Sequence, residues 1–219
     1  MENVAWFGNA GFSFIDKSSG KRIYYIDPFQ LPKRGLPKAD IIFITHAHPD
    51  HLSAGDVEKL LREETVVVAT PDSLETLKIT QQKFPVEPNN YYDVKGFKFQ
   101  TVPAYNLKPE RLQFHPQENK WVGYIFELNG KKFYHAGDTD FIPEMREFSK
   151  RHLDVAMLPM GGYYTMDVDE MIEAARAIQA KTVIPMHYKM QLGGKYKEAE
   201  EKLKSELKDT QILILKEFS

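Results

Sequence analysis

The sequence predicts an α/β fold built in layers, with one set of strands and helices followed by a second set. Short runs rich in branched and aromatic residues alternate with amphipathic helical patterns along the chain. The 219 residues, 42% of them hydrophobic, are enough for one well-buried core. The breaks at residues 30–38 and 84–90 are too short for domain linkers. A single domain over residues 1–219 is therefore expected.

Each expected strand is a short run of branched, aromatic or alternating residues. Strands are expected at residues 4–7, 12–15, 22–26, 41–44, 66–69, 97–102, 122–128, 132–135, 155–158, 182–184 and 211–215. Asn129-Gly130 separates two of these runs and is a strong hairpin signal. Helical spacing of apolar residues occurs at 54–63, 71–78, 145–151, 169–179 and 195–207. Ser53 is expected to cap the first helix, and Asp167 or Asp169 the fourth.

The charge balance and composition exclude several classes of partner. Lys and Arg total 29 against 31 Asp and Glu, so the chain has no strong positive field to attract nucleic acid. No run of about eighteen apolar residues could span a membrane, and the start of the chain lacks the pattern of an export signal. The absence of cysteine fits a reducing compartment. A cytoplasmic protein with a small-molecule substrate is expected, and a homo-oligomer is compatible with the sequence.

The most informative segment, residues 45–51, reads Thr-His-Ala-His-Pro-Asp-His and follows an apolar run. Imidazole and carboxylate groups are the ligands that divalent ions such as zinc prefer. Alternation along an extended backbone puts His46 and His48 on one side, where they could hold one ion. Asp50 and His51 follow on a loop before a helix and could serve a second ion. A polar loop with surface histidines is the alternative, but lone histidines seldom cluster at ligand spacing.

Two later segments put ligand-type residues at strand ends, where the sites of α/β proteins lie. Gly137-Asp138-Thr139-Asp140 follows one expected strand, and His187 follows another in Pro185-Met186-His187. Asp138 could bridge two cations, and His187 could complete the coordination of the second one. Taken singly, Gly-Asp-Thr is a common turn and Pro-x-His could be a capped strand end. Their order after the histidine-rich segment favours the metal-site interpretation.

Together with Asp27 in Ile26-Asp27-Pro28, these motifs resemble the metallo-β-lactamase superfamily of metal-dependent hydrolases, and the resemblance runs from Trp6 to His187. Four further stretches resemble the small, single-domain, lactonase-like branch, namely residues 6–8, 102–106, 136–140 and 158–162. The resemblance implies a four-layer αββα sandwich. It also implies a site for two divalent metal ions, zinc first, with manganese or iron as alternatives.

The resemblance also implies a role for each ligand. The first ion would take His46 and His48, the second would take Asp50, His51 and His187, and Asp138 would bridge them. Asp27 resembles an acid that accepts a hydrogen bond from a ligand histidine and so orients its ring.

The chain departs from the family pattern at two positions. Where relatives carry a third histidine for the first ion, this chain has Asn106 in Pro103-Ala104-Tyr105-Asn106. Asn106 could coordinate through its amide oxygen, or His115 could fold back from its loop and take the place. His115 is favoured slightly, with a solvated loop residue as the alternative. Asn9 stands where many members of the branch have a histidine, so specificity here is expected to differ if that histidine contacts substrate.

The resemblance suggests hydrolysis by a metal-bound hydroxide. Two ions roughly 3.5–4 Å apart would activate a bridging water and polarise the oxygen of the attacked group, and Asp50 would orient the hydroxide and carry its proton. By analogy with the branch, the substrate is expected to be a small ester, a lactone or a phosphoester. Asn106, Tyr163, Tyr164 and Lys189 are candidate substrate-binding residues, although a packed tyrosine and a solvated lysine are the ordinary alternatives.

Three rival functions remain to be distinguished. Di-iron redox relatives have a glutamate in place of His48 and a following flavin domain, and the sequence has neither. Nucleases of the superfamily add a substrate-gripping arm or an inserted domain, and no segment here could be either. A non-catalytic or mononuclear metal-binding domain is the remaining alternative, because the third histidine is missing at position 106. Metal-dependent turnover would separate it from a hydrolase.

Overall fold

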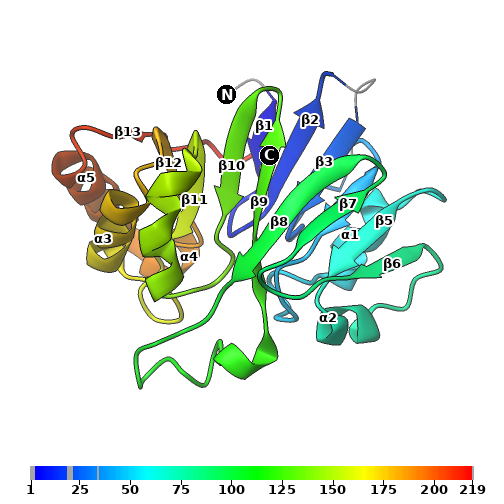
Figure 1. Ribbon diagram of the computed structural model, residues 1–219, viewed down its shortest axis with the longest axis horizontal. Coiled ribbons are helices and arrows are strands. Elements are labelled where there is room, and N and C mark those ends of the chain that lie inside the picture. Colours follow the sequence, from blue (N-terminus) through cyan, green and yellow to red (C-terminus); the bar gives the residue numbers. More distant parts are fainter. Residues whose placement is uncertain (1–2, 19–21, 34, 219) are drawn as a thin grey trace. The chain divides into compact units, whose positions relative to one another are not determined.

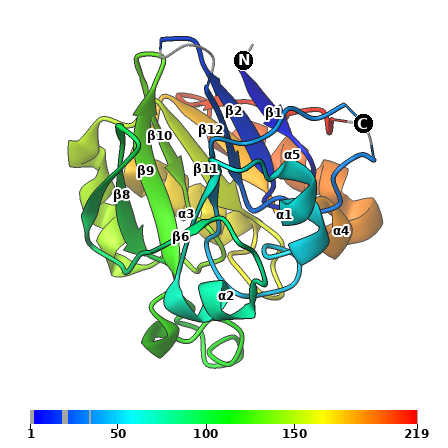
Figure 2. The ribbon, with the colours of Figure 1, turned by 90° about the vertical axis from the view of Figure 1, so that its right-hand side faces the viewer.

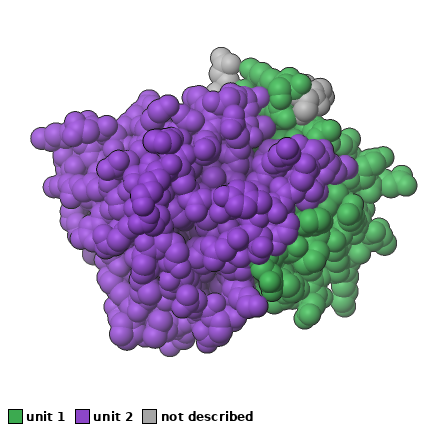
Figure 3. All heavy atoms as spheres, in the orientation of Figure 1, with its two compact units in different colours: residues 1–87, 215–219 green, residues 88–214 purple. Residues whose placement is uncertain are grey.

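The computed structural model describes residues 3–18, 22–33 and 35–218, and it divides the chain into two compact units (Figures 1 and 3). Unit 1 comprises Met1–Glu87 with Leu215–Ser219, and unit 2 comprises Pro88–Ile214. Each unit contains one mixed β-sheet and its own helices. The predicted α/β class is therefore confirmed, whereas a single domain over the whole chain stays a prediction.

Unit 1 is built on a six-stranded sheet in the order β1-β2-β3-β4-β5-β6. Its strands are β1 (Val4–Trp6), β2 (Phe12–Asp16), β3 (Arg22–Ile26), β4 (Ile41–Phe43), β5 (Val66–Ala69) and β6 (Gln82–Pro85). The first three are antiparallel, and β3 to β6 are parallel. Helices α1 (Ala54–Leu60) and α2 (Pro71–Thr76) connect the later strands. Ile42 and Val67 pack with Val57 and Leu60 of α1 in a buried apolar cluster, as expected for a parallel sheet covered by helices.

Unit 2 is built on a seven-stranded sheet in the order β13-β12-β11-β10-β9-β8-β7. Its strands are β7 (Tyr91–Val94), β8 (Phe97–Pro103), β9 (Val122–Leu128), β10 (Lys131–His135), β11 (Val155–Pro159), β12 (Thr182–Met186) and β13 (Gln211–Ile212). Strands β7 to β10 form an antiparallel meander, and β10 to β13 are parallel. All seven strands are labelled in Figure 1, and β8 to β12 are seen from another side in Figure 2. The α-helices are α3 (Val168–Ile178), α4 (Lys189–Leu192) and α5 (Tyr196–Glu206), and the 3₁₀ helices are η1 (Gln117–Asn119), η2 (Pro143–Arg151) and η3 (Gly193–Lys195).

The predicted helix starts are confirmed by their caps. The Ser53 hydroxyl accepts a hydrogen bond from the Asp56 N–H at 3.4 Å. The Asp167 carboxylate accepts from the Glu170 N–H, and the Glu170 carboxylate accepts in return from the Asp167 N–H, so α3 begins with a capping box. Each cap satisfies backbone donors that have no partner within the helix.

Several elements differ from the sequence prediction for physical reasons. Strands β6 and β7 were not predicted; each lies at an edge of its sheet, where Pro85 and polar residues are tolerated but weaken the strand pattern. Residues 143–151 form a 3₁₀ helix rather than an α-helix, and α1 ends at Leu60 because Leu61 is extended. Within the described ranges, no helix combines the length and the apolar character that a membrane crossing requires.

Candidate metal centre

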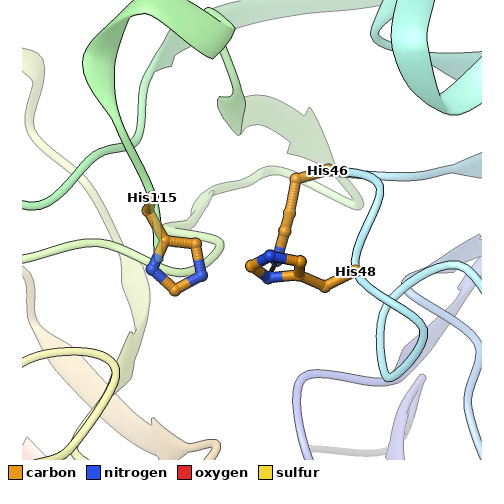
Figure 4. A group of neighbouring side chains, drawn as sticks. All are labelled: His46, His48 and His115. Atoms are coloured by element: carbon orange, nitrogen blue, oxygen red, sulfur yellow. Dashed lines mark hydrogen bonds between the residues drawn. The ribbon is translucent and has the colours of Figure 1, made fainter. Parts of the chain in front are cut away.

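The ligand-type residues lie just beyond strand ends in each unit. Seven histidine and aspartate side chains belong to groups that could hold a metal ion, namely His46, His48, Asp50, His51, His115, Asp138 and His187. The first four follow β4 in unit 1, and the last three lie in unit 2 on the loops after β8, β10 and β12. Figure 4 shows His46 and His48 on one loop and His115 on its own loop. These are all seven of the ligands predicted from the sequence.

Asp27 organises the ligand loop of unit 1. Parallel pairing of Ile26 with Phe43 sets Asp27 beside the chain that leaves β4, and a positive φ of 46° turns its carboxylate toward that chain. The buried carboxylate accepts hydrogen bonds from the Thr45 N–H at 2.8 Å, from the Thr45 hydroxyl at 2.7 Å and from Nδ1 of His51 at 2.8 Å. The geometry is the one expected of the acid that orients a ligand histidine.

These bonds also determine which nitrogens of two histidines carry protons. A carboxylate only accepts, so His51 must be protonated at Nδ1, which leaves Nε2 as a lone-pair donor for a metal. The single hydroxyl proton of Thr45 goes to Asp27, so the Thr45 oxygen must accept from Nδ1 of His46, 2.9 Å away. His46 therefore also presents a bare Nε2. One carboxylate thus sets the tautomer of two candidate ligands.

His46 and His48 have the spacing of two ligands for one ion. Nε2 of His46 lies 3.1 Å from Nδ1 of His48, and the two rings meet nearly edge to face. Two nitrogens bound to one zinc ion at about 2.0–2.1 Å lie about 3.4 Å apart at the tetrahedral angle. The observed separation therefore suits a shared ion with little movement of either ring.

Asp50 is the most exposed of the candidate acidic ligands, with a side chain 34% accessible. Its carboxylate accepts a hydrogen bond from the Asn9 side-chain amide at 3.0 Å, and its backbone carbonyl accepts from the same amide at 3.1 Å. Asn9 is itself held in place because its backbone carbonyl accepts a hydrogen bond from the Trp6 indole N–H at 3.0 Å. Asn9, noted in the sequence as a departure from the family pattern, therefore orients Asp50.

In unit 2, Asp138 lies between two histidines. One carboxylate oxygen of Asp138 is 3.4 Å from Nε2 of His115 and 3.3 Å from Nε2 of His187, and all three side chains are buried. Because β10 and β12 run parallel, their carboxyl ends bring Asp138 and His187 to one edge of the sheet. The His115 loop folds back to the same place, so His115 is not a solvated loop residue.

His187 is held from two directions. Its backbone has a φ of +53°, and Nδ1 lies 2.8 Å from the side-chain amide of Gln191 in α4. The amide nitrogen and oxygen occupy equivalent positions after a half-turn, so the Gln191 oxygen can accept from Nδ1–H when Nε2 binds a metal. Gly161 packs against the same segment, because a Cβ there would lie 2.6 Å from the His187 carbonyl oxygen.

Asn106 is not placed as an open ligand. It is 1% exposed; its oxygen accepts from Nδ1 of His115 at 2.8 Å, and its amide nitrogen donates to Asp140 and to the Tyr164 carbonyl, each at 3.1 Å. Both ends of the amide are therefore engaged with protein groups. Of the two residues considered for the missing third histidine, His115 is the one that belongs to a group of side chains that could hold a metal ion.

A buried ion-pair network anchors the loops around His115. Arg111 donates to Asp140 at 2.8 Å, to Glu170 at 2.7 Å and to the Gly162 carbonyl at 2.7 Å. Burial disfavours the charged form of Glu170, but hydrogen bonds from the Asp167 N–H, from Arg111 and from Lys108 outweigh it and lower the Glu170 pKa. Burial also opposes the charge on Arg111, yet its acidic partners raise the Arg111 pKa.

The other predicted substrate-binding residues are also in unit 2. Tyr163 and Tyr164 are 67% and 41% exposed and form an aromatic cluster with Phe114, with ring centroids 4.7 to 5.6 Å apart. Phe114 of this Phe114–Tyr163–Tyr164 cluster directly precedes His115 in the chain. Lys189 is placed differently, with its ammonium over the Tyr196 ring at 5.8 Å.

Sequence reasoning assigned no role to several residues that hold these ligands. Thr45 lies inside the histidine-rich segment, and Asp140 lies in the Gly-Asp-Thr-Asp stretch, but neither was singled out. Gln191 lies four residues after His187 in the short helix α4, which begins at Lys189 and was not predicted from the sequence. Arg111 had no local signal, because its partners are 29 to 59 residues away in the chain.

The donor set fits divalent metal ions. The ligand-type atoms are imidazole nitrogens and carboxylate oxygens, without thiolates, which suits zinc, manganese or iron. Nδ1 of His46, His51 and His115 each lies against an oxygen acceptor, so each Nε2 is presented as a lone pair. Such outer hydrogen bonds are typical of metal-ligating histidines.

Comparison with known proteins agrees with this fold. The family model of the beta-lactamase superfamily domain matches residues 3–187. The chain is 36% identical to a UPF0173 metal-dependent hydrolase of Methanoculleus marisnigri, over 84% of this chain and 80% of the relative. It is 33% identical to one of Thermoplasma acidophilum, over 86% and 84%. A crystal structure of a protein from Parabacteroides distasonis matches with a TM-score of 0.83 and 29% identity, covering 97% of this chain and 93% of that one.

The chain therefore belongs to the metallo-β-lactamase superfamily of metal-dependent hydrolases. Its predicted fold class is confirmed by the two mixed sheets and by the match to that structure.

Proposed function

We propose that this protein hydrolyses a small ester or lactone at a dinuclear metal site. The observation that carries the proposal is the set of fixed tautomers: His46, His51 and His115 each direct a bare Nε2 away from an acceptor at Nδ1. Three imidazoles prepared in this way are what a metal site needs and what a structural core does not. Membership of the superfamily supports the same chemistry.

The ligands divide into two sets under this proposal. His46, His48 and His115 would hold the first ion, Asp50, His51 and His187 would hold the second, and Asp138 would bridge both. The position of Asp138 supports the bridging role, because one of its oxygens already faces a histidine from each set, His115 and His187. Zinc is the first candidate, with manganese or iron as alternatives.

The protein groups would then divide the work of hydrolysis. When bound, the ions supply Lewis acidity and make a water molecule acidic enough to act as hydroxide near neutral pH. Asp50 would hold that nucleophile and pass its proton to the leaving group, since it is the most solvent-accessible carboxylate of the set. Asn9 would keep the Asp50 carboxylate oriented for this transfer. Asp27 would keep His46 and His51 in their ligand tautomers.

The surroundings of His115 support a carboxylic ester or lactone with an apolar group over a phosphoester. The Phe114–Tyr163–Tyr164 cluster offers exposed aromatic rings beside the ligand. The nearby cations are already paired: Arg111 with Asp140 and Glu170, and Lys108 with Glu170. An anionic substrate would have to compete with those carboxylates.

The metal content of the purified protein tests the site. Protein prepared without chelators should contain about two equivalents of zinc, manganese or iron per chain, and His46→Ala should lose most of this metal. His152→Asn is the matched control, because His152 is exposed at the end of η2 and asparagine tolerates its positive φ. About one equivalent or less in the wild type would contradict the dinuclear site and favour a mononuclear enzyme or a binding protein.

Turnover tests the reaction class. Protein loaded with its native metal should hydrolyse aryl esters or lactones and lose that activity with a chelator, whereas a metal-binding domain would show no metal-dependent turnover. Tyr163→Ala should raise KM for aryl esters roughly tenfold, about 1.4 kcal/mol of lost aromatic contact, with little effect on acetyl esters of small alcohols. Tyr91→Ala is the control, since Tyr91 is 79% exposed on β7. Preference for a phosphodiester would contradict the proposed substrate class.

A further inference from the structure

A chain of buried hydrogen bonds leads from Asp140 to His115. The Asp140 carboxylate accepts from the Asn106 amide nitrogen at 3.1 Å, and the Asn106 oxygen accepts from Nδ1 of His115 at 2.8 Å. Asp140, Asn106 and His115 are each 2% exposed or less. Nε2 of His115 then faces the Asp138 carboxylate at 3.4 Å. The three residues are the Asp140–Asn106–His115 relay.

The relay has a direction. Asp140 can only accept while it is ionised, so the Asn106 amide must present its nitrogen to Asp140 and its oxygen to His115. The oxygen can only accept, so His115 must carry its proton on Nδ1. The ionised carboxylate at one end, together with the Tyr164 carbonyl that accepts from the same amide nitrogen, therefore determines the tautomer at the other end.

Asp140 is held firmly enough to act in this way. Four donors converge on its carboxylate: the Asn106 amide, the N–H groups of Leu107 and Lys108, and the Arg111 guanidinium. Arg111, 5% exposed, keeps positive charge beside Asp140. A backbone hydrogen bond closes the loop between Asn106 and His115, since the Asn106 N–H donates to the His115 carbonyl at 2.8 Å.

We propose that Asn106 and Asp140 are positioning residues that hold His115 in the Nδ1–H tautomer, so that a loop histidine serves where the chain has no histidine at position 106. This inference rests on the proposed function in one respect: it takes Nε2 of His115 to be a metal ligand. Asn106 is then not a substrate contact, because its amide is buried and engaged at both ends. The relay does for His115 what Asp27 and Thr45 do for His46.

The tautomer of His115 in metal-free protein is the direct test. Nitrogen-15 NMR of histidine-labelled protein distinguishes the protonated ring nitrogen from the bare one, and His115→Gln assigns the signal. The wild type should show Nδ1–H. In Asp140→Asn the Tyr164 carbonyl is the one remaining obligate acceptor for the Asn106 amide nitrogen, so the amide orientation is less fixed and part of the His115 population should carry its proton on Nε2. Adding Asn106→Asp should return it to Nδ1, because a carboxylate at position 106 can only accept.

A matched control and a second variant keep the test decisive. Asp154→Asn removes another unit 2 carboxylate that accepts from a backbone N–H and a lysine, and it should leave the His115 tautomer unchanged. If Asp140→Asn does not fold, Asn106→Leu removes the acceptor while leaving the Leu107, Lys108 and Arg111 donors to Asp140 in place. His115 remaining wholly Nδ1–H in Asp140→Asn, or in Asn106→Leu, would overturn the relay.

Metal binding gives an independent readout. Asp140→Asn should weaken the affinity for one ion by about 10–100-fold while the other ion binds as in the wild type, and the double variant should recover most of the loss. If the tautomer moves as expected but the wild type binds no metal, the relay stands and the proposed function fails. If the wild type binds two ions and Asp140→Asn binds both unchanged, the relay fails and the proposed function stands.

Discussion

Replacing Asp27 with asparagine should disable two histidines with one isosteric change. The carboxylate accepts from the Thr45 N–H, the Thr45 hydroxyl and Nδ1 of His51. An amide that keeps its oxygen toward the Thr45 N–H must turn its nitrogen toward the other two groups. His51 must then accept at Nδ1 and carry its proton on Nε2. The Thr45 hydroxyl, now accepting from the amide, must donate to His46 and move that proton to Nε2 as well.

The expected magnitude follows from these two tautomers. Loss of an outer hydrogen bond to a metal ligand typically weakens metal affinity by about 10–100-fold. If the two histidines act independently, Asp27→Asn should weaken metal binding by about 100–10,000-fold, or about 3–6 kcal/mol in total. The fold should lose less, about 1–3 kcal/mol, because a neutral amide replaces the charged acceptor of three buried hydrogen bonds.

Competition titration against a chromophoric chelator at neutral pH would measure this loss, with urea unfolding of the metal-free proteins alongside. Asp56→Asn is the matched control, because Asp56 is 6% exposed and likewise accepts from two backbone N–H groups, those of Gln30 and Leu31. It should lower stability without changing metal affinity. If the Asp27→Asn variant folds and binds metal as tightly as the wild type, the tautomer reasoning is refuted.

Two further predictions concern stability and backbone fit. The pKa of Glu170 is lowered in the folded protein, so its stabilising contribution is present above the ordinary glutamate pKa and declines as pH falls through the lower folded value. Glu170→Gln should therefore cost more stability at pH 7 than at pH 3.5 by urea unfolding, and an equal cost at both values would contradict the lowered pKa. Gly161→Ala should displace the His187 carbonyl, which would lie 2.6 Å from the new Cβ, and should weaken metal binding about tenfold or more. Gly194→Ala, with nothing within 4 Å of its Cβ position, should leave calorimetric metal affinity unchanged, and equal effects of the two changes would contradict the packing argument.

The sequence predicted the fold class well because its signal is local. Strands such as β5, four buried branched or small residues, and caps such as Ser53 and Asp167 depend on neighbouring residues. Strand β6 was missed because an edge strand with exposed Gln82 and Lys83 has no apolar alternation.

The ligand-type residues were predictable from the sequence, and the groups that orient them were not. Residues 45–51 carry four ligand-type groups within one short segment, which no local structural role requires. By contrast, Asp27 reaches His51 across 24 residues, and Asn106 reaches Asp140 across 34. Such pairs depend on the register of parallel strands, which a single sequence does not specify. A sequence pattern can therefore identify candidate metal ligands without identifying the residues that orient each imidazole ring.

Under the proposed function, those orienting groups explain how the chain can lack a histidine at position 106 and still present a full set of imidazoles. A histidine ligand needs two things, a ring within reach of the ion and an acceptor at the opposite nitrogen. At position 106 this chain supplies the acceptor and not the ring, while His115 supplies the ring from a loop that Asp140 and Arg111 anchor. The two requirements are thus met by different residues. It follows that Asn106→His should not improve the site: the added imidazole would remove the acceptor for His115 and compete with it, so metal affinity should fall or stay level in a chelator titration. A gain of tenfold or more would mean that position 106, and not His115, is the natural ligand position.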